Sequence, residues 1–131
     1  MRTTLAAVAT VCCMTAGPAA LPVHGNEVPT TPKEIGQRYG QALGVLEVCY
    51  GSKLTDKAKA LPENFKDLDL EVFKVASANV LDAWVKVRGC TNQRDPNVCK
   101  IIMDKSCLAA EAEIGQNGSA LPGLVEFLPH N

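Results

Sequence analysis

Four cysteines in the later part of the chain restrict its fold more than any other feature. They are Cys49, Cys90, Cys99 and Cys107. In an exported domain, an even number of cysteines is typical of structural disulfides formed in an oxidising compartment. A zinc site would favour Cys-x2-Cys spacing or histidines, whereas here 40, 8 and 7 residues separate successive cysteines. We therefore expect two disulfides and no metal site.

The N-terminus has the layout of a secretory signal. Arg2 gives it one positive charge, and the mostly apolar run at 5–17 follows and ends before Pro18. This run is shorter than the roughly 20 residues that a membrane-spanning helix needs, and no longer apolar segment follows it. We therefore expect an exported protein, periplasmic or extracellular, with no membrane span.

Cleavage is expected after Gly25, because Pro22 and His24 resemble the polar end of a secretory signal. Gly17 and Ala19 offer small residues for an earlier cleavage. A lipoprotein signal would need a small residue directly before its acceptor cysteine, but a valine stands before the first cysteine of the chain. We therefore predict a signal peptide at 1–25.

Removal of residues 1–25 leaves residues 26–131, which form a mature chain without Cys12 and Cys13. Its length suits a single domain with one modest core. The formal charge of the full chain is −1, and loss of Arg2 makes it more negative by one, so neither sign dominates. Since no basic stripe with interleaved aromatic residues is present, we expect no nucleic-acid partner.

Helical spacing of apolar residues is the strongest periodicity after the signal. A helix is expected over about 32–50, because Thr31 can cap it, Pro32 suits its first position and Glu34 can complete a capping box. Its apolar face would consist of Ile35, Tyr39, Ala42, Leu43, Leu46, Cys49 and Tyr50. A short connecting helix is expected over 55–61, capped by Thr55 or Asp56 and ended near Pro62.

Two further long helices are expected. One covers about 69–88, with Asp67 or Asp69 as its cap, and the other begins at Asp95-Pro96 and ends before Gly115. The inner faces would consist of Leu70, Phe73, Val80, Leu81, Trp84 and Val87 in the former, and of Cys99, Ile102, Met103, Ser106, Ala110 and Ile114 in the latter.

The C-terminal segment contains turn signals at Asn117-Gly118 and Pro122-Gly123, and we expect the short apolar run at 124–128 to fold back on the core. No stretch between turns alternates apolar and polar residues, so we expect no sheet. The predicted fold class is all-α, a small disulfide-bonded bundle of three long helices and one short helix.

Helix geometry limits how the cysteines pair. Cys99 and Cys107 would lie about 12 Å apart along one helix, whereas a disulfide needs Cα atoms within about 7 Å. Cys90 precedes this helix, and its reach to Cys99 is shorter than its reach to Cys107. We therefore favour Cys90–Cys99 and Cys49–Cys107 over the remaining alternative.

Gly36, Gly40 and Gly44 form a ladder on one face of the first expected helix. Such spacing lets another backbone approach closely. The ladder either packs within the domain or forms a face for self-association or a partner. We favour packing within the domain, which can offset the cost of glycine in a helix.

No residues stand out as catalytic. The only histidines are His24, removed with the signal, and His130, next to the C-terminus, so a nucleophile would lack its base. Glu111 and Glu113 are close in sequence, but two residues apart on a helix they face different directions. No Cys-x-x-Cys, Walker or Gly-x-Gly-x-x-Gly motif occurs, so we expect no cofactor.

One resemblance covers less than a third of the mature chain. It concerns Leu54-Thr55-Asp56-Lys57-Ala58 and the segment that runs from Ser106-Cys107 through Glu113-Ile114-Gly115 to Leu121-Pro122-Gly123-Leu124. They resemble small exported helical proteins of alpha-proteobacteria, which implies a location but no activity. The last three cysteines are spaced similarly to those of insect odorant-binding proteins, but that pattern's two earlier cysteines are missing, so no ligand function is carried over.

The expected function is that of an exported, non-enzymatic binding or accessory protein. We expect a monomer whose partner is a protein or a small ligand that the sequence does not identify. The alternatives are a small hydrolase that uses carboxylates and a carrier of an apolar ligand held between the helices.

Overall fold

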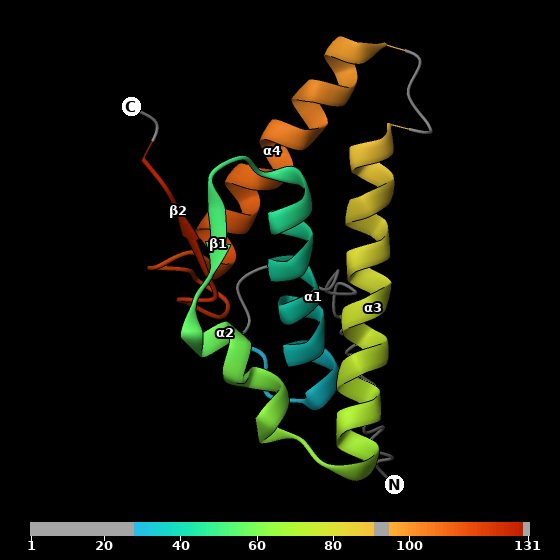
Figure 1. The fold of residues 1–131 in the computed structure, drawn as a ribbon, viewed down its shortest axis with the longest axis vertical. Helices are drawn as coiled ribbons and strands as arrows, with labels where there is room; N and C mark the ends of the chain where they lie inside the picture. Colours follow the sequence, from blue (N-terminus) through green and yellow to red (C-terminus); the bar gives the residue numbers. More distant parts are fainter. Residues whose placement is uncertain (1–27, 91–94, 130–131) are drawn as a thin grey trace, which may run out of the picture.

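The computed structural model describes residues 28–90 and 95–129. Within these ranges the chain forms four α-helices, one 3-10 helix and a two-stranded sheet (Figure 1). In chain order the elements are α1 Pro32–Val48, β1 Ser52–Leu54, α2 Asp56–Ala60, η1 Leu61–Asn64, α3 Asp67–Gly89, α4 Pro96–Ile114 and β2 Val125–Phe127. The predicted signal peptide with Cys12 and Cys13, its cleavage site, and both histidines lie outside the described residues.

Helix α1 begins as its sequence predicts. The Thr31 hydroxyl accepts a hydrogen bond from the Glu34 N–H at 3.2 Å, and the Glu34 carboxylate accepts one from the Thr31 N–H at 3.0 Å. The helix ends earlier than expected, because Cys49 is already extended and Gly51 has a φ of 74°. Tyr50 therefore lies outside the helix with 92% of its surface exposed, so its assignment to the apolar inner face was wrong.

The predicted N-terminal capping residue is wrong for α3 and confirmed for α4. Lys66 occupies the cap position of α3 without a side-chain hydrogen bond, and Asp67 has a φ of 50°, so neither predicted aspartate caps this helix. At α4 the Asp95 carboxylate accepts a hydrogen bond from the Asn97 N–H at 2.8 Å, as the Asp-Pro signal predicted. Thr55 caps α2 in the same way, through the Ala58 N–H.

Helices α1 and α3 pack side by side along the glycine ladder (Figure 1). A Cβ atom added to Gly36 would lie 2.5 Å from the Phe73 carbonyl oxygen, and one added to Gly40 would lie 2.9 Å from the Ser77 Cα. The partner residue advances as the glycine number advances, so the two helices run parallel. The preference for packing within the domain is confirmed.

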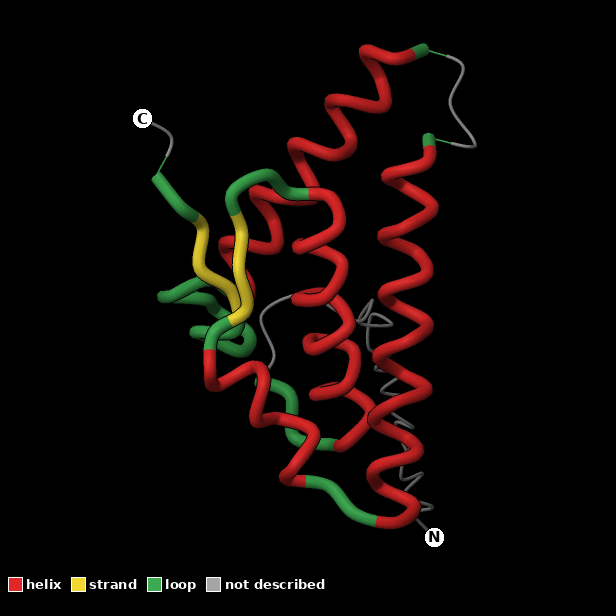
Figure 2. Tube along the Cα trace, in the orientation of Figure 1, coloured by secondary structure: helices red, strands yellow, loops and turns green. Residues whose placement is uncertain are grey.

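A two-stranded antiparallel sheet corrects the prediction that the chain has no sheet. Ser52, Lys53 and Leu54 pair with Phe127, Glu126 and Val125, respectively. Figure 2 shows both strands on one side of α1 and α3 on the other. Each strand has only three residues, which is too short for an alternating pattern to stand out in the sequence. The helical fold class is otherwise as predicted.

The core lies between α1, α3, α4 and the C-terminal segment. Its buried side chains come from Ala42, Val45, Cys49, Ala58, Leu61, Phe73, Ala110, Ile114, Leu124 and Val125. Phe73 is 1% exposed, and its ring lies 5.2 Å from Tyr39 and 4.8 Å from Phe65 between ring centroids. Leu124 and Val125 are fully buried, so the C-terminal segment folds back on the core as expected.

Two disulfides connect the helices. Cys49 is bonded to Cys107 and Cys90 to Cys99, with Cα–Cα distances of 5.8 and 5.9 Å. These are the pairs that the helix geometry favours. Within the described ranges, the helices are too short or too polar to cross a membrane.

Candidate functional site

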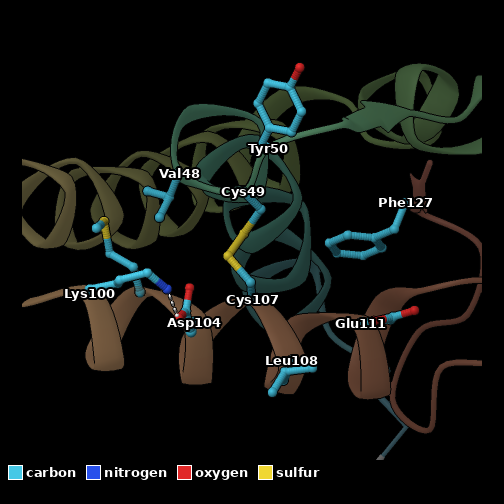
Figure 3. A pocket seen from close by; sticks show the side chains of 10 residues that line it. Val48, Cys49, Tyr50, Lys100, Asp104, Cys107, Leu108, Glu111 and Phe127 are labelled. Atoms are coloured by element: carbon cyan, nitrogen blue, oxygen red, sulfur yellow. Dashed lines mark hydrogen bonds and ion pairs between the residues drawn. A yellow bond between two sulfur atoms is a disulfide. The ribbon is translucent and has the colours of Figure 1, made fainter. Parts of the chain in front are cut away.

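A pocket opens beside the Cys49–Cys107 disulfide (Figure 3). Its volume is about 480 Å³. The lining residues are Val48, Cys49, Tyr50, Lys100, Met103, Asp104, Cys107, Leu108, Glu111 and Phe127. Apolar side chains and the disulfide form most of this lining, and its charged side chains, Lys100, Asp104 and Glu111, all come from α4.

Three elements create the pocket. The end of α1 supplies Val48 and Cys49, and β2 supplies Phe127, whose ring is directed toward the disulfide in Figure 3. The contributions of α4 recur at three- and four-residue steps from Lys100 to Glu111, which places them on one face of that helix. The disulfide fixes α1 to this face, while β2 is held in place by its pairing with β1.

The rim of the pocket exposes large apolar side chains. Tyr50 is 92% exposed and Leu108 is 66% exposed. Leu128, 53% exposed, follows Phe127 directly, and its N–H donates to the Gly51 carbonyl at 2.8 Å. Exposed apolar residues that gather beside a concave site are typical of binding surfaces, since a partner that covers them removes apolar area from water.

The charged side chains of the pocket carry a net negative charge. The Lys100 ammonium donates to the Asp104 carboxylate at 2.6 Å, so these two charges largely neutralise each other. The Glu111 carboxylate has neither an ion pair nor a hydrogen bond with any residue in the described ranges, and only the Glu111 backbone carbonyl accepts a hydrogen bond, from the Gly115 N–H. One negative charge is therefore left over at the pocket.

Glu113 lies apart from this pocket and has a structural role. Its carboxylate accepts hydrogen bonds from Arg38 at 2.6 Å and from Gln41 at 2.7 Å, and Arg38 also donates to the Gln41 side chain at 3.0 Å. This network joins α4 to α1. Glu111 and Glu113 thus face different directions, as their spacing predicted, and do not form a catalytic pair.

Asp104 and Glu111 are the two carboxylates that the pocket does contain. They are two helical turns apart, roughly 10 Å along the axis. Both are exposed, and Asp104 is already engaged by Lys100. A carboxylic acid that serves as a proton donor near neutral pH needs an apolar, desolvated environment. This arrangement is therefore better suited to binding charge than to hydrolysis.

No metal-binding group of three or more histidine, cysteine, aspartate or glutamate side chains is present in residues 28–90 and 95–129. The four cysteines predicted as disulfide residues are engaged in the two bridges. One of these bridges contributes to the pocket wall, a role that the spacing of the cysteines does not indicate. Tyr50 and Phe127 were also missed as site residues, although the position of Tyr50 directly before the turn residue Gly51 was a usable signal for the former.

Comparison of the chain with protein-family models, with curated proteins and with solved structures finds no match.

Proposed function

We propose that the protein is an exported, non-enzymatic binding protein whose binding site is the pocket beside Cys49–Cys107. The observation that carries this proposal is a concave, largely apolar site of about 480 Å³ with an exposed tyrosine on its rim. Binding sites for small molecules are commonly apolar pockets of about 300–1,000 Å³ with a few polar groups. The size and the lining of this pocket both fit that description.

Export is supported by two independent features. The N-terminal sequence has the layout of a signal peptide, and two disulfides are typical of an oxidising compartment. The resemblance to small exported proteins of alpha-proteobacteria agrees with this location. Mass spectrometry of the protein recovered outside the cytoplasm should find a chain that begins near Asn26. A chain recovered there with Met1 intact would overturn the proposal of a cleaved signal.

Binding in the pocket can be tested with a neutral, solvent-sensitive fluorescent dye. We expect the dye to become brighter on addition to the mature protein, because it enters an apolar environment. Replacement of Tyr50 by alanine should weaken dye binding without loss of stability, since Tyr50 is almost fully exposed. Met103→Trp, which places a larger side chain in the pocket wall, should weaken dye binding as well.

Leu68→Ala is the matched control for Tyr50→Ala. Leu68 is 76% exposed but belongs to α3 and does not line the pocket. This control should bind the dye as the wild-type protein does. If Leu68→Ala loses the dye while Tyr50→Ala and Met103→Trp retain it, the binding surface lies on α3 and the proposed site is wrong.

A further inference from the structure

We infer that the pocket accepts an apolar ligand that carries a cationic group, and that Glu111 recognises this group. The inference rests on the proposed function, because it specifies the ligand class of the same pocket. Two observations carry it: the mostly apolar lining, and the excess of one negative charge among the pocket's ionisable groups.

The position of Glu111 relative to the apolar wall favours such a ligand. Glu111 lies one helical turn after Cys107, whose sulfur forms part of the wall. Figure 3 shows Glu111 and Phe127 at one end of the pocket, and Lys100 with Asp104 at the other. The apolar part of a ligand can therefore cover the disulfide while its charged group reaches the Glu111 end.

Phe127 adds a second attraction at this end. A cation that lies over the face of an aromatic ring is attracted by the ring's quadrupole. The ring of Phe127 and the carboxylate of Glu111 thus favour the same charge.

The charged groups near Glu111 and Phe127 do not remove the preference for a cationic ligand. Glu126, next to Phe127 in β2, is engaged by Lys53 at 2.8 Å, and its carboxylate raises the pKa of the Lys53 ammonium through their hydrogen bond. Lys100 is engaged by Asp104 at the opposite end of the pocket. An anionic ligand would meet the unneutralised Glu111 carboxylate and would be repelled.

Three probes with one apolar chain and different head groups test the inference. They are octyltrimethylammonium, octyl glucoside and octyl sulfate, each added to the mature protein below its micelle-forming concentration. Calorimetric titration should show the tightest binding for the cationic probe and the weakest for the anionic one. Added salt should reduce the difference, because it screens the charge of the exposed Glu111.

Glu111→Gln should weaken binding of the cationic probe about threefold to fivefold, which is the upper part of the range for exposed charge pairs. The same variant should leave the affinity for octyl glucoside unchanged, because its apolar contacts remain. Glu63→Gln serves as the control, since Glu63 is an exposed carboxylate of η1 that does not line the pocket. It should bind all three probes as the wild-type protein does.

The outcomes separate this inference from the proposed function. If the three probes bind equally well, or if Glu111→Gln leaves binding of the cationic probe unchanged, the inference is wrong while the pocket remains a binding site. If Tyr50→Ala and Met103→Trp bind every probe as the wild-type protein does, the pocket is not the site and both proposals fail.

Discussion

The two sides of α1 are held by different means. On one side α1 packs against α3 with glycine backbone directly against the backbone of Phe73 and Ser77. On the other side a disulfide and the Arg38–Glu113 ion pair connect α1 to α4. The first contact leaves no space between the helices, whereas the second leaves the pocket beside the disulfide.

This difference indicates how a small domain can combine a rigid core with a concave surface. Close packing fills the space between two elements, so it cannot also leave a cavity there. A covalent bridge holds two elements at a fixed separation without the need to fill all the space around it. The α1–α3 contact therefore supplies a compact base, and the disulfide on the opposite side can border an open site.

Removal of the bridges should have the largest effect and would show how much the α4 side depends on them. Cys49–Cys107 joins residues 58 apart, and Cys90–Cys99 joins residues 9 apart. In the chain-entropy model such loops stabilise a domain by about 4 and about 3 kcal/mol, respectively. A Cys49/Cys107 double serine variant should therefore unfold at lower denaturant concentration than a Cys90/Cys99 double serine variant, both compared with the oxidised wild type.

Peptide mapping without reduction is the control for this comparison. It should recover Cys49 linked to Cys107 and Cys90 linked to Cys99. A peptide that links Cys49 to Cys99 would overturn the pairing. Equal midpoints of unfolding for the two variants would instead show that the long-range bridge does not hold the α4 side more firmly than the short one.

Replacement of Gly40 by leucine tests the other side of α1, where the helix packs against α3. Whereas the serine variants remove a bond, this substitution adds a side chain to a closely packed contact. The new side chain would be forced against the backbone of Ser77. We expect a loss of about 3 kcal/mol in the free energy of unfolding, with no change in oligomeric state. Denaturant unfolding and size-exclusion chromatography with light scattering measure the two quantities.

Gln37→Leu is the matched control for Gly40→Leu, because Gln37 is an exposed residue of the same helix. Its effect on stability should stay within about 0.5 kcal/mol. A wild-type dimer that becomes a stable monomer in the Gly40→Leu variant would show that the glycine ladder is an assembly face and would contradict the prediction.

Acidification should have the smallest effect on stability, through the Glu34 carboxylate at the start of α1. The N–H groups of Thr30 and Thr31 donate to the Glu34 carboxylate and hold its pKa below the ordinary value of 4.5. A carboxyl group with a lowered pKa in the folded state stabilises the fold above its unfolded pKa. This contribution is lost as the pH falls through the folded pKa.

The stability difference between the wild type and Glu34→Gln should therefore be constant near neutral pH and shrink below about pH 4.5. Denaturant unfolding at a series of pH values measures it. Glu63→Gln leaves the α1 cap intact and serves as the control. Its difference in stability from the wild type should not shrink below about pH 4.5 in this way. A Glu34→Gln difference that grows on acidification would contradict the assignment.

Local signals in the sequence predicted the parts of the fold that depend on neighbouring residues. The capping residues Thr31 and Asp95 each satisfy N–H groups within a few residues, so the starts of α1 and α4 could be read directly. The disulfide pairs could be derived because a helix fixes the distance between Cys99 and Cys107. The glycine ladder indicated close packing, although not which helix would supply it.

The sheet and the pocket depend on residues that are distant in sequence. Ser52 pairs with Phe127, and neither strand is long enough to show an alternating pattern. The pocket then depends on β2 to bring Phe127 next to α4. For this reason Glu111 could be named as a carboxylate from the sequence, but its place beside an apolar wall could not.

The two disulfides together also determine how α1 and α3 are aligned along their axes. Gly36 and Gly40 are four residues apart and both lie against backbone of α3, so a shift of α3 by one turn, about 5 Å, would again place backbone opposite Gly40. Cys49 at the end of α1 is bonded to Cys107, and Cys90 at the end of α3 is bonded to Cys99 of the same α4 helix. Residues 99–107 thus act as a rigid strut between the two helix ends, and this strut excludes the shifted register.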